Sequence, residues 1–166
     1  MPNFGLTCLN LRELVLNANR LTGKLPDLSS FKALELLDVD NNQLRGNIPW
    51  DTLYTLVQSH SLRRLHLSDN KFDVAEIPEK VGQMRKLEEL GLAGLEYTGA
   101  IPDFSACKSL KKLWLHSNRL SGFIPESLTE CQQLVSLILC DNKLEKPSPD
   151  FSGCKAMKEL YFWTDM

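Results

Sequence analysis

The stretch that decides the fold is LKKLWLHSNRLSGFIP, residues 110–125. Apolar and polar residues alternate at its start, so Leu113 and Leu115 point to one face of a short strand while Trp114 and His116 point to the other. The asparagine, glycine and proline that follow are typical of turns. The segment therefore predicts a half-buried strand followed by a turn, with two aromatic rings on the outward face.

The same pattern occurs six times along the chain and begins a seventh time. The first apolar residues of the seven copies are Leu11, Leu34, Leu62, Leu87, Leu110, Leu134 and Met157, which gives periods of 23, 28, 25, 23, 24 and 23 residues. Such periods indicate a solenoid, in which each repeat buries its apolar face against its neighbours.

The copies follow L-x-x-L-x-L-x-x-N-x-L, and several continue as L-x-G-x-I-P. This pattern resembles the leucine-rich repeat, and its tail resembles the plant-type subclass of receptor-kinase ectodomains and polygalacturonase-inhibiting proteins. The resemblance implies an α/β solenoid, a right-handed superhelix with a parallel concave β-sheet and short helical or irregular convex segments. We expect residues 1–166 to form a single leucine-rich-repeat domain of about six full repeats with partial repeats at both ends. The tails at residues 72–78 and 144–149 depart from L-x-G-x-I-P, which predicts an irregular second strand there.

One asparagine recurs where the chain turns off each predicted strand. A buried amide at that point can satisfy backbone groups of its own coil and of the neighbouring coil, so the asparagines should form a ladder. Repeat four has Leu95 at this position, for which apolar packing in place of the amide is the favoured interpretation and a local weak point is the alternative. The asparagines concerned are Asn19, Asn42, Asn70, Asn118 and Asn142.

The longest repeat carries its extra residues in PWDTLYTLVQSHSL, residues 49–62. Its apolar residues have helical spacing, and Asp51 precedes them as a candidate cap. We expect a short helix on the convex side. Trp50 and Tyr54 would cover the core or, alternatively, make a secondary contact there.

Four of the five cysteines occupy one repeat position, three residues before the first apolar residue of their repeat. Phe31 and Met84 fill the same position in other copies, which predicts a core position with reduced, buried thiols. A disulfide between adjacent coils is the alternative. Cys140 falls on the outward face and is the one thiol expected to be exposed. The four core cysteines are Cys8, Cys107, Cys131 and Cys154.

The chain contains no G-x-S-x-G, H-E-x-x-H, C-x-x-C or phosphate-loop motif, so we expect neither catalysis nor a cofactor. His66 and His116 both face outward but lie two coils apart, about 10 Å, which is too far for a shared zinc ion. No metal site is expected. The formal charge of −2 gives no reason to expect nucleic acid, and no apolar run is long enough to insert into a membrane.

The outward positions predict the binding surface. Stacked across repeats, the central column reads Val15, Asp38, His66, Gly91, Trp114, Ile138 and Tyr161, and the next reads Asn17, Asp40, Ser68, Ala93, His116, Cys140 and Trp163. Aromatic residues without a core to join are frequent interface anchors. Gly91 and Ala93 suggest a shallow trough beside Trp114, unless small residues only relieve crowding. The predicted protein-binding residues are His66, Gly91, Trp114, His116, Ile138, Tyr161 and Trp163, although Trp163 could instead cover the end of the core.

These features predict a non-catalytic module that recognises a protein or peptide on its concave face. The alternative is a structural spacer within a larger array, in which further repeats of the same polypeptide are the neighbours. The compartment stays open between the cell surface, which the resemblance implies, and the cytoplasm, which the odd cysteine count and the lack of N-x-S/T sites favour.

Overall fold

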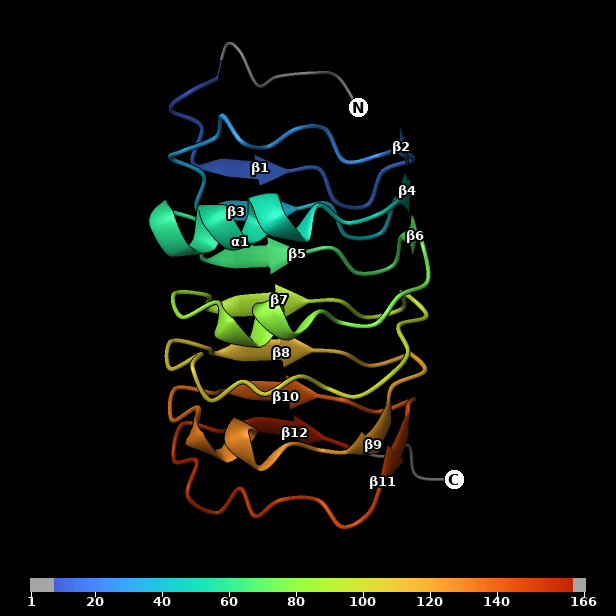
Figure 1. The fold of residues 1–166 in the computed structure, drawn as a ribbon, viewed down its shortest axis with the longest axis vertical. Helices are drawn as coiled ribbons and strands as arrows, with labels where there is room; N and C mark the ends of the chain where they lie inside the picture. Colours follow the sequence, from blue (N-terminus) through green and yellow to red (C-terminus); the bar gives the residue numbers. More distant parts are fainter. Residues whose placement is uncertain (1–7, 163–166) are drawn as a thin grey trace.

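The computed structural model describes residues 8–162, and its main feature is one parallel sheet of seven short strands. The strands stack in sequence order from the N-terminal to the C-terminal repeat, as Figure 1 shows. The neighbouring strands are in register, so equivalent positions of successive repeats lie side by side. The strands are β1 (Glu13–Val15), β3 (Leu36–Asp38), β5 (Arg64–His66), β7 (Glu89–Gly91), β8 (Lys112–Trp114), β10 (Ser136–Ile138) and β12 (Glu159–Tyr161).

Five further strands pair along a second edge of the solenoid, at the right of Figure 1. The strands β2 (Thr22–Gly23), β4 (Gln43–Gly46) and β6 (Lys71–Phe72) form one sheet, and β9 (Ser121–Phe123) pairs with β11 (Lys143–Glu145). Between these groups, repeat four contributes an isolated bridge from Glu76 to Thr98, and its Tyr97 and Gly99 carbonyls accept from the N–H groups of Arg119 and Ser121. The irregularity predicted after Phe72 is therefore present, whereas the one predicted after Leu144 begins only beyond β11.

The convex side carries α1 (Trp50–Ser59) and two 3₁₀ segments, η1 (Glu79–Gln83) and η2 (Glu126–Glu130). Helix α1 buries Leu53, Leu56 and Val57, the residues with helical spacing. The expected cap was wrong, because Pro49 occupies the N-cap and Asp51 lies in the first turn, where it pairs with Lys80. Trp50 and Tyr54 are half-buried against the core.

The core lies between the main sheet and the convex segments. Each strand of the sheet contributes a central leucine, and these leucines are paired across the register from repeat to repeat. Leu65, Leu90 and Leu113 are fully buried, whereas Leu160 in β12 is 38% exposed at the end of the described array. The predicted architecture is confirmed: the chain is a solenoid with a parallel sheet on one side and short helical segments on the other.

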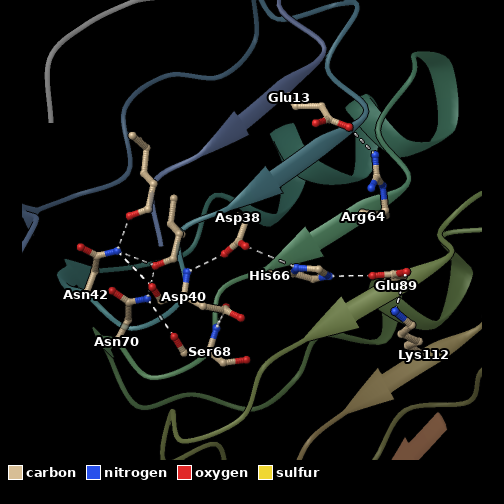
Figure 2. A network of polar contacts seen from close by, with 12 residues as sticks. Glu13, Asp38, Asp40, Asn42, Arg64, His66, Ser68, Asn70, Glu89 and Lys112 are labelled. Atoms are coloured by element: carbon tan, nitrogen blue, oxygen red, sulfur yellow. Dashed lines mark hydrogen bonds and ion pairs between the residues drawn. The ribbon is translucent and has the colours of Figure 1, made fainter. Parts of the chain in front are cut away.

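Asparagine amides connect the successive coils where the strands end. The Asn118 Nδ2 donates to the carbonyls of Leu115 and His116 in its own coil and to that of Leu92 in the preceding coil. Its Oδ1 accepts from the backbone N–H groups of Leu95 and Tyr97. Asn42, Asn70 and Asn142 make the equivalent bonds in their repeats, partly shown in Figure 2.

Two positions depart from this arrangement. Asn19 in the first repeat is exposed, and among residues 8–162 its Nδ2 bonds the carbonyls of Leu16 and Asn17 in its own loop. Leu95 in repeat four is 3% exposed and joins the hydrophobic core. Apolar packing thus replaces the amide there, as expected.

Three of the four cysteines that share one repeat position lie in the core. Cys107, Cys131 and Cys154 are buried with free thiols, and the Cys107 Sγ donates to the Gly82 carbonyl at 3.0 Å. Burial raises the pKa of Cys107 to about 12 and that of Cys131 to about 11. Cys8 departs from the prediction, because it lies in the first described coil and is only half-buried.

We expect Asn118→Ala to lower the free energy of unfolding by about 1–3 kcal/mol, because truncation leaves buried backbone groups of two coils unpaired. Asn19→Ala is the matched control and should cost less, since its amide bonds only its own exposed loop. Urea denaturation of both variants measures the difference. Equal midpoints for Asn118→Ala and wild type would contradict a structural role for the amide.

Native thiol labelling should divide the cysteines by burial. We expect Cys140 and Cys8 to react in the folded protein, while Cys107, Cys131 and Cys154 react only after denaturation. The protected thiols are out of reach of the reagent, and burial disfavours the reactive thiolate of each. Mass spectrometry of labelled peptides gives the outcome, and rapid native labelling of Cys107 would contradict the core assignment.

Candidate functional site

The register of the main sheet aligns the central column of outward side chains. Asp38 lies opposite His66, His66 opposite Gly91, and Gly91 opposite Trp114. Trp114 is in turn paired with Ile138, and Ile138 with Tyr161. The structure therefore brings together five of the residues singled out in the sequence. His116 lies in the next column, and Trp163 lies outside the described residues.

Of the two interpretations of Gly91, the contacts favour relief of crowding over an open trough, because the rings of His66 and Trp114 meet over this strand. Gly91 is buried, and the rings of His66 and Trp114 meet with centroids 5.5 Å apart and planes tilted by 42°. A Cβ at Gly91 would lie 3.0 Å from the Ser68 Oγ and 3.5 Å from the Trp114 Cε3. The glycine therefore accommodates the ring contact above it and does not provide open space for a ligand.

Trp114 is half-buried on the outward face of β8. Its indole Nε1 donates to the Ser136 Oγ at 3.1 Å, and the Lys112 Nζ lies 5.4 Å from the ring centroid. An ammonium group at this distance is attracted to the face of the ring. The ring is therefore held in one orientation by neighbours from three strands.

The C-terminal part of the column is more open. Tyr161 is 55% exposed and Ile138 is half-buried beside it. His116 is half-buried, and its Nδ1 has no hydrogen-bond partner among the described residues although solvent does not reach it. Together with Trp114, these residues form the apolar patch, which we define as Trp114, His116, Ile138 and Tyr161.

Charged side chains occupy the N-terminal part of the concave face (Figure 2). The His66 Nε2 lies 3.0 Å from the Glu89 carboxylate, whose other oxygen lies 3.1 Å from the Lys112 Nζ. Arg64 reaches across an intervening strand to Glu13 at 2.8 Å. The alternating charges thus pair across strands, as the sequence indicated.

An acidic pair that sequence reasoning had not singled out lies at the end of β3. Asp38 and Asp40 are both half-buried, and burial together with the charge of Asp38 raises the pKa of Asp40 to about 7. The backbone N–H of Ser68 donates to Asp40 and opposes this shift. The sequence contains a signal for this pair: Asp38 and Asp40 occupy alternate positions of one repeat, and His66 occupies the position of Asp38 in the next repeat.

A polar surface pocket of about 570 Å³ lies outside the concave sheet, between α1 and η1. Tyr54, Gln58, Arg85 and Asp103 are among its lining residues. Its lining is mostly polar, unlike the largely apolar sites that bury small molecules. The concave sheet is therefore the stronger candidate site. Within residues 8–162, no helix is long and apolar enough to cross a bilayer.

The chain belongs to the leucine-rich repeat family. The Leucine Rich Repeat family model matches residues 10–31, 33–53, 61–84 and 109–131, which together are more than half of the chain. Among curated relatives, receptor-like protein 39 of Arabidopsis thaliana is 32% identical over 114 residues, 68% of this chain and 13% of the relative. The chain thus spans a small part of the length of that relative.

Solved receptor structures share the fold over nearly the whole chain. The PEPR1–AtPEP1 structure superposes with a TM-score of 0.80 and 29% identity, covering 92% of this chain and 21% of that one. The plant peptide hormone receptor RGFR1 in complex with RGF2 gives a TM-score of 0.79 and 30% identity, over 97% of this chain and 29% of that one. The similarity therefore lies in the repeat region of larger proteins.

We expect Gly91→Arg to lower the free energy of unfolding by about 1–3 kcal/mol, because the new side chain must displace the His66 and Trp114 rings. Gly153→Arg is the matched control, since a Cβ at Gly153 meets nothing within 4 Å. Denaturant midpoints and near-ultraviolet circular dichroism measure the two effects. A Gly91→Arg protein as stable as the control would show that the ring contact does not fill this strand.

Proposed function

We propose that this chain is a non-catalytic recognition module that binds an extended peptide or protein segment across its concave sheet. The observation that carries the proposal is the apolar patch, where three adjacent strands present Trp114, Ile138 and Tyr161 in register on the face away from the core. Exposed aromatic residues on such a face are typical anchors of protein interfaces. Gly91 and His66 complete the site by supporting the Trp114 ring.

The relatives support recognition as the general role. RGFR1 is a plant peptide hormone receptor solved in complex with RGF2, and the curated match is a receptor-like protein. By analogy, this chain would act at the cell surface, with a protein or peptide as its partner. The net charge of −2 gives no electrostatic advantage for nucleic acid, in keeping with a protein ligand.

The two parts of the concave face suggest how a ligand would be oriented. Apolar groups of a peptide would pack on the apolar patch, while its polar groups would face the network around Asp38, His66 and Glu89. Trp114 stands at the boundary between the two parts, because it contacts the His66 ring on one side and is paired with Ile138 on the other. We expect Trp114 to be a central anchor for this reason.

The test uses a random peptide library displayed on phage and selected on the immobilised chain. We expect Trp114→Ala to weaken the binding of selected peptides by about 2 kcal/mol or more, roughly 30-fold in Kd, and Tyr161→Ala to weaken it less. Lys108→Ala is the control, because Lys108 is exposed on another face and pairs with Glu130. Melting temperatures confirm that each variant is folded.

The second candidate function is a structural spacer of a larger array. The small share of each relative that this chain spans favours it, because most of the length of those proteins lies outside the matched part. Selected peptides that bind Trp114→Ala, Tyr161→Ala and Lys108→Ala equally would overturn the concave site. A selection that enriches no peptide would favour the spacer.

A further inference from the structure

Three metal-ligating side chains converge at the acidic end of the concave face. Asp38 and Asp40 alternate along the chain, so both carboxylates lie on the outward side, and Asp38 is paired in register with His66 of the next strand. One ligand atom from each of the three residues lies within 4.8 Å of the others. Figure 2 shows the Asp38 carboxylate facing the His66 ring and the Asp40 carboxylate bonded to the Ser68 N–H.

The orientation of the His66 ring is fixed by Glu89 and Trp114, which contact it on the side away from Asp38. Its Nε2 lies 3.0 Å from Glu89, which in turn holds Lys112, and its face contacts the Trp114 ring. Because Glu89 accepts from Nε2, a neutral ring has its lone pair on Nδ1. Histidines that bind metals typically donate their other ring N–H to a carboxylate in this way.

The Nδ1 of His66 faces a second carboxylate, that of Asp38, but does not form a hydrogen bond with it. It lies 3.9 Å from the Asp38 Oδ2, which is beyond hydrogen-bond distance, and the two side chains are only 13% and 17% exposed. Two lone-pair donors held close in a poorly solvated place repel each other unless a proton or a cation lies between them. The geometry is that of ligands around a shared ion.

The charges around the cluster do not neutralise it. Asp38 and the more distant Asp69 both place negative charge near Asp40, whose carboxylate accepts a hydrogen bond from the Ser68 N–H. Two basic side chains on the neighbouring strands pair with other acids, Arg64 with Glu13 and Lys112 with Glu89. Neither forms an ion pair with Asp38 or Asp40 among the described residues.

We infer that Asp38, Asp40 and His66 bind one divalent transition-metal ion of the zinc type, with Glu89 orienting the imidazole. An imidazole with two carboxylates suits zinc, whereas calcium and magnesium prefer sets made entirely of oxygen ligands. Three protein ligands leave a coordination position open toward the concave surface. The inference does not rest on the proposed peptide binding, since it concerns the chain alone.

The experiment is isothermal titration of the full chain with zinc chloride, with the cysteines kept reduced by a phosphine. We expect one zinc ion per chain and a melting temperature that rises with zinc concentration. Asp38→Ala and His66→Gln should each weaken binding at least 10-fold, and Glu89→Gln should weaken it by about 10- to 100-fold. The matched controls His60→Gln and Asp73→Asn, both outside the cluster, should bind zinc like the wild type.

Two further measurements distinguish loss of zinc binding from loss of folding, and the proposed site from zinc bound by cysteine thiolates. Asp40→Asn removes one of two repelling carboxylates, so without metal it should melt no lower than the wild type, yet it should lose the zinc-dependent rise. The spectrum of the cobalt form should show no thiolate charge-transfer band, and Cys140→Ser should bind zinc normally. Zinc affinity that is unchanged in His66→Gln, or abolished in Cys140→Ser, would overturn the assignment. No binding at millimolar zinc would also overturn it.

Discussion

The side-chain amide at the end of each main strand is the interaction on which the array depends. A coil that turns off a parallel sheet leaves backbone carbonyls and N–H groups facing inward, where water does not reach them. Asn118 satisfies three carbonyls and two N–H groups at once, drawn from two coils. Because one amide serves two coils, it fixes the distance and register between repeats as well as the turn within one.

That fixed register determines what the concave face can present. With neighbouring strands in step, the outward residues of one repeat are always beside the same positions of the next. Single substitutions in separate repeats thereby build a continuous surface, polar around Asp38 and His66 and apolar around Ile138 and Tyr161. The boundary between the two parts lies at Gly91, where a missing side chain allows the rings of adjacent repeats to meet.

The sequence predicts the backbone and the columns because both follow from simple periods, so that alignment of the repeats alone places Trp114 beside Ile138. It does not predict the direction in which side chains lean. The trough expected at Gly91 follows from the size of that residue, yet rings from both sides fill the space above it. Likewise, only the rotamers bring ligand atoms of Asp38, Asp40 and His66 within 4.8 Å of one another. Contacts between repeats depend on torsion angles that no repeat pattern encodes.

The interruption of the second-edge strands at repeat four has a mechanical consequence. Repeats three and four share one bridge on that edge, between Glu76 and Thr98, and Leu95 contributes no side-chain amide to the preceding coil. Repeats four and five remain joined there, because the Arg119 and Ser121 N–H groups donate to the Tyr97 and Gly99 carbonyls. Between repeats three and four, the alignment of the charged half with the apolar half therefore depends mainly on the hydrogen bonds of the main sheet.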